Sequence, residues 1–257
     1  MWDPAVYHRF GSERSRPFFD LVGQVEAEKP RAVVDLGCGP GELTGTLAER
    51  WPEARVTGVD SSPEMIEKAL SAPGTVEFRI GDVRDWTPGP DVDVLVTNAT
   101  LQWVPGHQQL LTRWARELPR GAWLAMQVPG NFGAPSHRAL REVARSAPFA
   151  AATGDVVRDE PVDDAVGYAA LLTGVGATVD AWETTYVHML ADSGPEHPVL
   201  RWMEGTALRP VKAALDEEAW RRFRAALTER LVAAYPVRHG LVAFPFRRIF
   251  VVARTAL

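Results

Sequence analysis

Three glycines at alternate positions make the stretch DLGCGPG (35–41) the part of this chain best suited to hold a ligand. Gly37, Gly39 and Gly41 remove side chains where the backbone must turn sharply and let a ligand approach the main chain closely. A carboxylate, Asp60, follows the loop by about 20 residues and offers two acceptor oxygens, which suits the two hydroxyls of a ribose. This pattern predicts a binding site for a cofactor that contains a nucleoside.

The spacing of the glycines narrows the choice of cofactor. The dinucleotide fingerprint has glycine at its first, third and sixth positions, whereas the sixth position here is Glu42. The loop also lacks the lysine of a phosphate-binding P-loop. With Gly81 and Asp82 placed after a third apolar run, the pattern favours S-adenosylmethionine over NAD. Cys38, inside the loop, is expected to be a small residue packed under the turn and not a nucleophile.

Short apolar runs alternate with helical stretches through the first half of the chain and must position these residues. The expected strands are 31–36, 55–60, 76–80, 92–97 and 122–128. Such alternation predicts an α/β fold with a doubly wound, mostly parallel sheet covered by helices on both faces. Ligands bind such sheets beyond the carboxyl ends of the strands, where the glycine loop, Asp60 and Asp82 all fall.

Local signals mark the helices between these strands. Ser62 is placed to cap a helix that begins at Pro63, and Glu64 suits its positive end. In the stretch 107–118, apolar residues at helical spacing form one face, which comprises Leu110, Leu111, Trp114 and Leu118.

Composition limits the class of protein. The 257 residues carry a formal net charge of −5, so no basic field points to a nucleic-acid partner, although a small anionic substrate can still bind a local cationic pocket. One cysteine predicts neither an intrachain disulfide nor a zinc site, and no other metal site is expected. The charged N-terminus lacks the apolar core of a signal peptide, and no apolar run approaches a membrane span, so a cytoplasmic protein without membrane contacts is expected.

Four motifs resemble the class I S-adenosylmethionine-dependent methyltransferases. They are VVDLGCGPGELTGTLAERWP, GVDSSPEMIEKA, GDVRDWTP and NATLQWVPGHQQLL. The resemblance implies that Asp35 and the loop, Cys38 included, hold the methionine end of the cofactor and that Asp60 binds its ribose. It also implies an adenine site and a site near the sulfonium. Ser61, Met65, Asp82 and the backbone of Val83 would line the adenine, and Asn98, Leu101, Gln102 and Trp103 would lie near the sulfonium.

The similarity extends over nearly the whole chain, through ERSRPFFDLV, QVPGNFGAPSH, ETTYVHM, GTALRP and FPFRRIFVVAR. It implies methyl ester formation on a small polycarboxylic acid, with trans-aconitate as the first candidate. A carboxylate is ionised at neutral pH, so no base and no metal are required. The other carboxylates must be held by cations, preferably arginine. The main candidates for binding the acceptor are Arg209, Tyr186 and His188. Asn131, His137, Arg247 and Arg248 follow them.

The second half supplies the elements that would carry these residues. A loop is expected over 129–137, a strand over 179–190 with Trp182, Thr184, Tyr186 and His188 on one face, helices over 197–210 and 217–235, and a last strand over 246–254. Trp220, Phe223, Leu227 and Leu231 mark the packed face of the second helix. We interpret the chain as one domain, 1–257, with a cofactor-binding core over 31–128 and a helical insertion over 191–240 that covers the acceptor.

Two alternatives stay open. The acceptor could be another carboxylate or a hydroxyl, in which case His188 or His137 would serve as a base. The chain could instead bind the cofactor without catalysing a reaction. The N-terminal segment 1–30 is predicted to form an arm and a helix, and Trp2 and Tyr7 in it would close over the cofactor as a lid. The oligomeric state cannot be predicted from these patterns.

Overall fold

The computed structural model describes residues 15–71, 74–159 and 161–256, and these form two compact units. Unit 1 holds the described residues of Met1–Pro129, Val162–Thr184 and Arg248–Leu257, and unit 2 holds those of Gly130–Pro161 and Thr185–Arg247. Trp2 and Tyr7, the residues of the predicted lid, lie outside the described residues.

The strands follow the predicted alternation. They are β1 (Ala32–Leu36), β2 (Arg55–Asp60), β3 (Glu77–Ile80), β4 (Val92–Asn98), β5 (Trp123–Pro129), β6 (Thr178–Ala191) and β7 (Leu241–Arg254). Their order in the sheet is β3-β2-β1-β4-β5-β7-β6, with β1 to β5 parallel and β7 antiparallel to β5. The reversal of strand order at β1 and β4 brings the loops after these strands to the same edge of the sheet, so the predicted doubly wound, mostly parallel sheet is confirmed.

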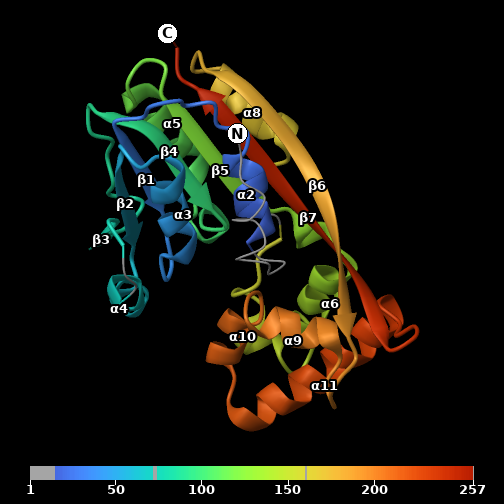
Figure 1. The fold of residues 1–257 in the computed structure, drawn as a ribbon. Helices are drawn as coiled ribbons and strands as arrows, with labels where there is room; N and C mark the ends of the chain where they lie inside the picture. Colours follow the sequence, from blue (N-terminus) through green and yellow to red (C-terminus); the bar gives the residue numbers. More distant parts are fainter. Residues whose placement is uncertain (1–14, 72–73, 160, 257) are drawn as a thin grey trace. The chain divides into compact units, whose positions relative to one another are not determined.

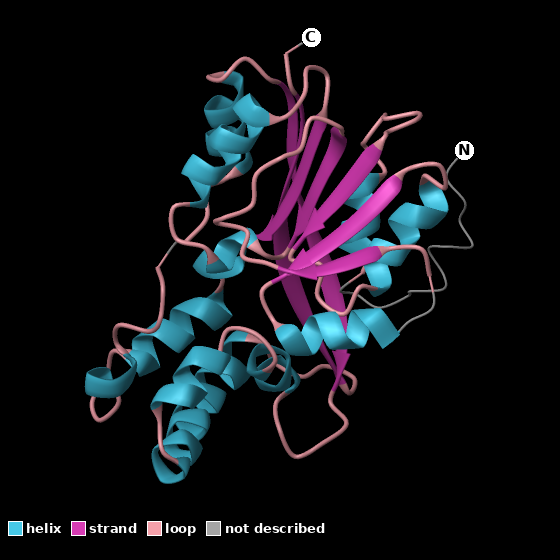
Figure 2. Ribbon diagram, turned by 90° about the vertical axis from the view of Figure 1, so that its left-hand side faces the viewer, coloured by secondary structure: helices cyan, strands magenta, loops and turns pink. Residues whose placement is uncertain are grey.

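Helices lie on both sides of the strands of unit 1 (Figures 1 and 2). They are α2 (Arg16–Val22), α3 (Glu42–Arg50), α4 (Pro63–Ser71), α5 (His107–Glu117) and α8 (Ala165–Thr173). α2 contacts β5, α3 contacts β2, and α5 contacts α8. Ser62 accepts a hydrogen bond through Oγ from the backbone N–H of Met65 at 3.3 Å, so it caps α4 as predicted.

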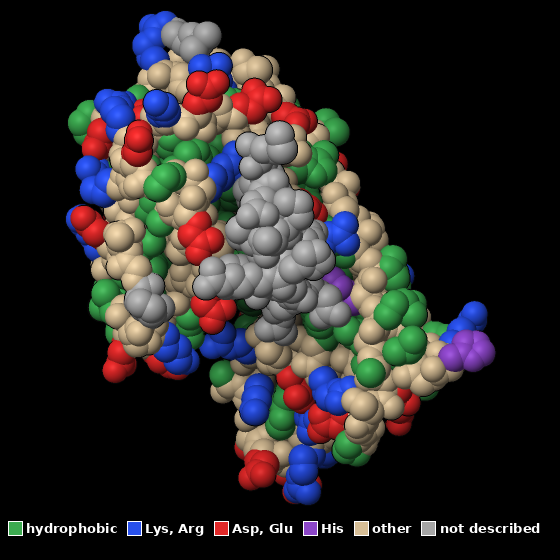
Figure 3. All heavy atoms as spheres, viewed as in Figure 1, with side chains coloured by type: hydrophobic (Ala, Val, Ile, Leu, Met, Phe, Trp, Pro, Cys, Tyr) green, Lys and Arg blue, Asp and Glu red, His purple; other side chains and the backbone are tan. Residues whose placement is uncertain are grey.

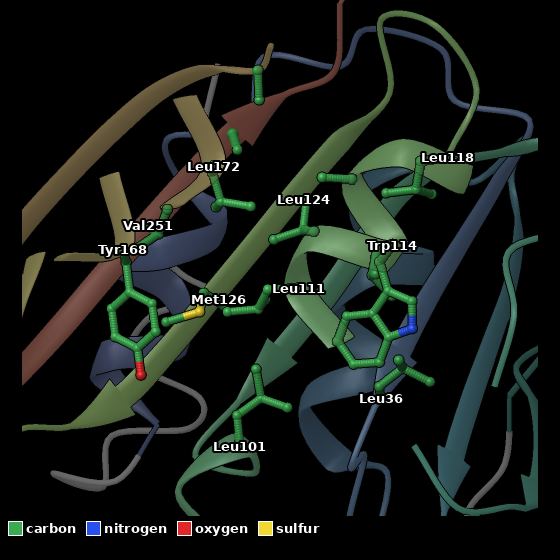
Figure 4. Packing of buried hydrophobic residues seen from close by; sticks show 14 of the residues in the cluster. Leu36, Leu101, Leu111, Trp114, Leu118, Leu124, Met126, Tyr168, Leu172 and Val251 are labelled. Atoms are coloured by element: carbon green, nitrogen blue, oxygen red, sulfur yellow. The ribbon is translucent and has the colours of Figure 1, made fainter. Parts of the chain in front are cut away.

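The largest core cluster lies between the sheet and the helices α5 and α8 (Figure 4). Leu111 and Trp114 of α5 are buried there with Tyr168 of α8 and with Met126 of strand β5. The Tyr168 hydroxyl lies 2.6 Å from Nε2 of the buried His107, so the polar end of this ring is satisfied inside the core. The apolar face predicted for residues 107–118 is therefore the face that holds the helix against the sheet.

Unit 2 is built mainly from helices. They are α6 (Pro135–Ala144), α7 (Ala150–Thr153), α9 (Pro198–Glu204), α10 (Arg209–Ala214) and α11 (Glu217–Ala234). Trp220, Phe223, Leu227 and Leu231 face its core, which confirms the packed face predicted for the long helix. The unit boundary falls inside two long strands, after Thr184 in β6 and after Arg247 in β7.

Three predicted boundaries in unit 2 are wrong. Strand β7 begins at Leu241 and not at Phe246. Residues 197–210 form two helices and not one: α9 ends at Glu204 and α10 begins at Arg209, because Pro210 lacks the N–H that a continuous helix would need there. Pro135, Ser136 and His137 belong to α6 and not to a loop. Proline at the first helical position costs no hydrogen bond, since that N–H has no partner within a helix.

Charged side chains of both signs are interspersed over the face that Figure 3 shows. Among the described residues, no helix is long and apolar enough to cross a membrane. The same residues contain no group of three or more His, Cys, Asp or Glu side chains arranged to hold a metal ion.

Candidate active site

The glycine loop follows β1 and has the left-handed backbone that its composition predicts. Gly37, Gly39 and Gly41 have φ values of +78°, +56° and +80°. A Cβ on Gly37 would lie 2.0 Å from Oγ1 of Thr100, whereas one on Gly39 would meet nothing within 4 Å. The loop thus packs against the protein at its first glycine and leaves open space at its second.

Hydrogen bonds within the protein use several of the loop's amides. The N–H groups of Gly37 and Cys38 donate to the carbonyl of Val59 at 2.7 and 3.1 Å, and the N–H of Gly39 donates to Oδ2 of Asp60 at 2.9 Å. A positively charged ammonium group would therefore meet carbonyl oxygens here and not these amides. Burial and the charges of Asp35 and Asp60 raise the pKa of the Cys38 thiol, so this side chain stays protonated, in keeping with a packing role.

Asp35 is the buried acid beside the loop. Its Oδ2 accepts a hydrogen bond of 2.7 Å from Oγ1 of Thr44 in α3. Burial raises the pKa of Asp35 to about 6, the hydrogen bond from Thr44 opposes this shift, and the charge of Asp60 adds to it. A cation bound beside Asp35 would favour its ionised form.

The carboxylates at the ends of β2 and β3 are fixed by local bonds. Asp60 accepts from the N–H of Ser62 through Oδ1 at 2.9 Å, so it organises the start of α4 as well as the loop. Asp82 pairs with Arg84, whose hydrogen bonds lower the pKa of Asp82 to about 2. Both acids keep acceptor capacity for a ribose or an adenine, because each carboxylate oxygen can accept more than one hydrogen bond. Ser61 is exposed, Met65 is half-buried and Val83 is buried nearby in the sequence.

A strained turn follows β4. Ala99 has φ +54°, which a residue with a Cβ seldom adopts. Its N–H donates to the carbonyl of Gln127 at 2.9 Å, and its carbonyl accepts from Nε2 of Gln102 at 2.6 Å. Thr100 rests on Gly37 and donates to the carbonyl of Asn98 at 3.2 Å. The turn thus fixes the short helix η1 (Leu101–Trp103) beside the glycine loop.

The residues of η1 differ in what their side chains can reach. Trp103 is 48% exposed, which rules out the core-packing role that its apolar ring would also allow. Gln102 is buried and serves the turn. Leu101 is fully buried in the core (Figure 4). Core packing against the sheet encloses this side chain, and its place near the sulfonium stays a prediction.

Replacing Ala99 with glycine tests the strain in this turn. Relief of the left-handed strain stabilises the folded state by about 1–2 kcal/mol, and the added freedom of the unfolded chain costs about 0.4–1 kcal/mol. We expect Ala99→Gly to leave the free energy of unfolding unchanged or to raise it by up to about 1.6 kcal/mol. Urea denaturation measures it. The matched change Ala48→Gly in helix α3 should destabilise by about 1 kcal/mol, and an equal loss in both variants would contradict the strain argument.

A line of polar side chains crosses one face of the sheet at its carboxyl end. Asn98 is the register partner of Gln127, and Gln127 is the partner of Phe250. Arg248 lies two residues from Phe250 and so points to the same face. Its Nη1 donates to Oε1 of Gln127 at 3.2 Å, and both side chains are buried. A predicted acceptor residue, Arg248, is thus held inside unit 1.

The other acceptor candidates belong to unit 2. There His188 is buried and stacks on Trp202 with ring centroids 4.8 Å apart, while Tyr186 lies 6.4 Å from it on the same strand. Asn131 is also buried and accepts the N–H of Arg247 through Oδ1 at 3.0 Å. Asn131 thereby ties the loop after β5 to β7. Its Nδ2 has no hydrogen-bond partner among the described residues.

Two further acceptor candidates of unit 2, Arg209 and His137, take no part in these contacts. Arg209 is exposed at the first position of α10. His137 stacks edge-on against Phe132 at 5.3 Å. Burial lowers the pKa of His137 to about 4, and the charge of Arg141 adds to this effect, so the ring is neutral at neutral pH. It can offer a hydrogen bond to an acceptor but not a positive charge.

The pH dependence of the free energy of unfolding should show that His137 is neutral in the folded protein. Its pKa is about 4 in the folded protein against 6.5 for a free histidine, so acidification protonates the unfolded chain first. The stabilising contribution is present above pH 6.5 and is lost as the pH falls toward about 4. We expect wild type to lose about 1–3 kcal/mol more than His137→Gln between pH 7.5 and pH 4.5 in urea unfolding. His239→Gln, on an exposed turn, is the control and should match wild type, and equal losses in all three would refute the assignment.

Several residues of this site escaped the sequence analysis. Thr44 and Thr100 belong to the motifs VVDLGCGPGELTGTLAERWP and NATLQWVPGHQQLL, but no role was predicted for either side chain. Phe78 would meet a Cβ on Gly41 at 2.5 Å and one on Gly58 at 2.7 Å, so it explains why glycine stands at both positions. Gln127 and Arg248 are paired across the sheet although 121 residues separate them. No local pattern signals such contacts.

The residues present fit S-adenosylmethionine. Gly39 lines open space that a Cβ would enter, Asp35 and Asp60 supply negative charge beside it, and Oδ1 of Asn98 is buried with no partner among the described residues. A cationic amino-acid group and a ribose both require acceptors of this kind.

Comparison with known proteins identifies the family. A family profile described as a methyltransferase domain matches residues 33–121. The chain is 56% identical to trans-aconitate 2-methyltransferase of Mycobacterium sp. (strain KMS) over 99% of this chain and 100% of that protein. It is 50% identical to the trans-aconitate 2-methyltransferase of Mycobacterium tuberculosis (strain ATCC 25177 / H37Ra) over 98% of this chain and 96% of that protein.

A solved structure shares the fold. The YcgJ protein of Bacillus subtilis superposes with a TM-score of 0.60 at 13% identity and covers 94% of this chain and 99% of that one. At this identity the likeness concerns the fold alone, and the sequence relatives decide the family. The chain belongs to the trans-aconitate 2-methyltransferases, which are S-adenosylmethionine-dependent methyltransferases of class I.

Proposed function

We propose that this protein transfers a methyl group from S-adenosylmethionine to one carboxylate of trans-aconitate and releases the monomethyl ester and S-adenosylhomocysteine. The identity of 50 to 57% to relatives of that name over nearly the full length carries the proposal. The buried pair of Arg248 and Gln127 at the carboxyl end of the sheet supports it, because a guanidinium suits a carboxylate.

The residues of the site would act by binding and alignment. Asp35 and the loop carbonyls would hold the methionine end of the cofactor, Asp60 its ribose, and Asp82 with Val83 its adenine. The bound cofactor supplies a methyl group on a sulfonium. The acceptor carboxylate is ionised at neutral pH, so no residue needs to remove a proton. Arg248 would orient the acceptor, and the exposed ring of Trp103 would limit the access of water.

A turnover assay tests the function. The purified protein is mixed with S-adenosylmethionine and one of trans-aconitate, cis-aconitate, citrate, isocitrate or a fatty acid, and methyl esters are detected by mass spectrometry. We expect a monomethyl ester from trans-aconitate in strong preference to the others. An ester from another acid only, or from none, would refute the assignment of the acceptor.

Arg209 is proposed as a cation that binds the acceptor. It is exposed on unit 2 and no ion pair with it is found among the described residues. We expect Arg209→Ala to raise the KM for trans-aconitate by about 10-fold or more, since a charge-assisted hydrogen bond contributes about 1.5–3 kcal/mol, and to leave the KM for S-adenosylmethionine within about twofold. Arg222→Ala, on an exposed position of α11, is the control. Equal changes in both KM values would remove Arg209 from the acceptor site.

A further inference from the structure

Gln127 combines three features that set it apart from the other polar residues of unit 1. Its side chain is 1% exposed, its Oε1 accepts a hydrogen bond from Arg248, and its Nε2 has no partner among the described residues. Burying an amide N–H without an acceptor costs about 1–3 kcal/mol. A position that bears this cost is a candidate for binding a ligand that supplies the acceptor.

The place of Gln127 in the sheet directs it toward the site. It lies near the carboxyl end of β5, opposite Asn98 of β4, and its own carbonyl accepts the N–H of Ala99. The strained turn before η1 and the orientation of Arg248 therefore both depend on this one residue. Asp35 lies on the same face of the sheet, because it is the register partner of Val96, two residues before Asn98.

The chemistry of the side chain suits a carboxylate ligand. An amide oxygen orients a guanidinium without bringing a negative charge, whereas a glutamate at this position would form an ion pair with Arg248. The amide nitrogen is a donor and matches an oxygen of a carboxylate. A neutral residue with one acceptor and one donor is what a site needs to hold an arginine in place and bind an anion beside it.

We propose that Gln127 recognises the acceptor: its Oε1 orients the guanidinium of Arg248, and its Nε2 donates a hydrogen bond to a carboxylate oxygen of the acceptor. This inference rests on the proposed function, since it requires a carboxylate acceptor. It adds to the site a residue that selects anionic acceptors over neutral ones.

Two variants of similar size test the inference. Gln127→Glu introduces a carboxylate that competes with the acceptor for Arg248, and Gln127→Met removes both polar atoms without adding charge. Binding of trans-aconitate is measured by calorimetry in the presence of saturating S-adenosylhomocysteine, together with binding of S-adenosylhomocysteine alone and the melting temperature. Gln109→Glu, an exposed glutamine on α5, makes the same change of charge away from the sheet and serves as the control.

We expect the Kd for trans-aconitate to rise by at least about 10-fold in Gln127→Glu and by about 3- to 10-fold in Gln127→Met, with the Kd for S-adenosylhomocysteine within about twofold in both. The KM for the acceptor should rise in the same order. A glutamate variant that destabilises the fold leaves the methionine variant as the test. Unchanged acceptor binding in folded variants, or weaker S-adenosylhomocysteine binding in its place, would overturn the inference. Failure of wild type to bind or methylate any acid would instead overturn the proposed function and the inference with it.

Discussion

Replacing Gly39 with alanine should weaken cofactor binding strongly while the protein stays folded. Gly39 has φ +56°, so a side chain costs about 1–2 kcal/mol of backbone strain, but its Cβ would meet no protein atom within 4 Å. The space that the methyl group would enter is the space we assign to the cofactor. We expect the Kd for S-adenosylhomocysteine to rise by about 100-fold or more, which corresponds to about 3 kcal/mol. Isothermal calorimetry measures the Kd.

Two neighbouring glycines give the controls for this experiment. Gly37→Ala would place Cβ 2.0 Å from Oγ1 of Thr100 and should lower the melting temperature as well as the affinity. Gly45→Ala, inside α3 with open space around its Cβ, should bind S-adenosylhomocysteine normally and stabilise the helix by about 0.5–1 kcal/mol. Wild-type affinity in folded Gly39→Ala would show that the loop does not hold the cofactor.

Replacing Asp35 with asparagine should stabilise the protein at neutral pH and weaken the binding of the cofactor. The pKa of Asp35 is raised from 3.8 to about 6, so the folded state holds the proton more tightly than the unfolded state. This contribution to stability is fully present below pH 3.8 and is lost as the pH rises through about 6. Asparagine avoids the buried charge. We expect Asp35→Asn to be more stable than wild type by about 1–3 kcal/mol at pH 7.5, with the difference disappearing near pH 4.

The affinity for the cofactor should fall in Asp35→Asn, whereas the stability of the fold rises. The amino-acid group of S-adenosylhomocysteine carries an ammonium that favours the ionised carboxylate, so its affinity for wild type should fall as the pH drops through about 6. Asp35→Asn should bind about 10- to 100-fold more weakly at pH 7.5 and should lose this dependence on pH. Calorimetry from pH 5 to pH 8 and urea unfolding provide both readouts.

Asp93→Asn provides a control at the other end of the sheet. Asp93 lies at the start of β4, where it pairs with Arg31 near the surface at 2.7 Å. Its loss should slightly destabilise the protein and leave cofactor binding intact. If Asp35→Asn destabilised the protein at pH 7.5, or bound the cofactor normally, Asp35 would be a structural acid and not part of the binding site.

The fold could be predicted in most respects from local patterns. The run RVTGVD forms β2 over the predicted residues, and Asp60 closes it as expected. A strand buried on both faces needs a continuous apolar run, and the helices between the strands need apolar residues at helical spacing, so both signals are local in the sequence. The left-handed loop is likewise predicted by Gly37, Gly39 and Gly41, because few other residues adopt that backbone conformation.

The details of the site required the tertiary structure. The Asp35 carboxylate was recognised, but its raised pKa depends on burial by the sheet and on Thr44 of the next helix. The side chain of Leu101 is buried in the core, which its position after β4 in the sequence does not indicate. Gln127 was not predicted as a site residue, because a single glutamine in an apolar strand does not indicate its hydrogen bond with Arg248.

The sequence by itself determined the α/β class, the alternation of strands and helices in the first half of the chain, and the loop and acids suited to S-adenosylmethionine, because these depend on residues close together in the chain. The structure decided which polar groups are buried and what they contact. Register decides that Asn98, Gln127 and Phe250 lie side by side on three strands. Such neighbours are set by the pairing of strands that are far apart in the chain. No local sequence pattern around Arg248 or Gln127 therefore predicts the hydrogen bond between them.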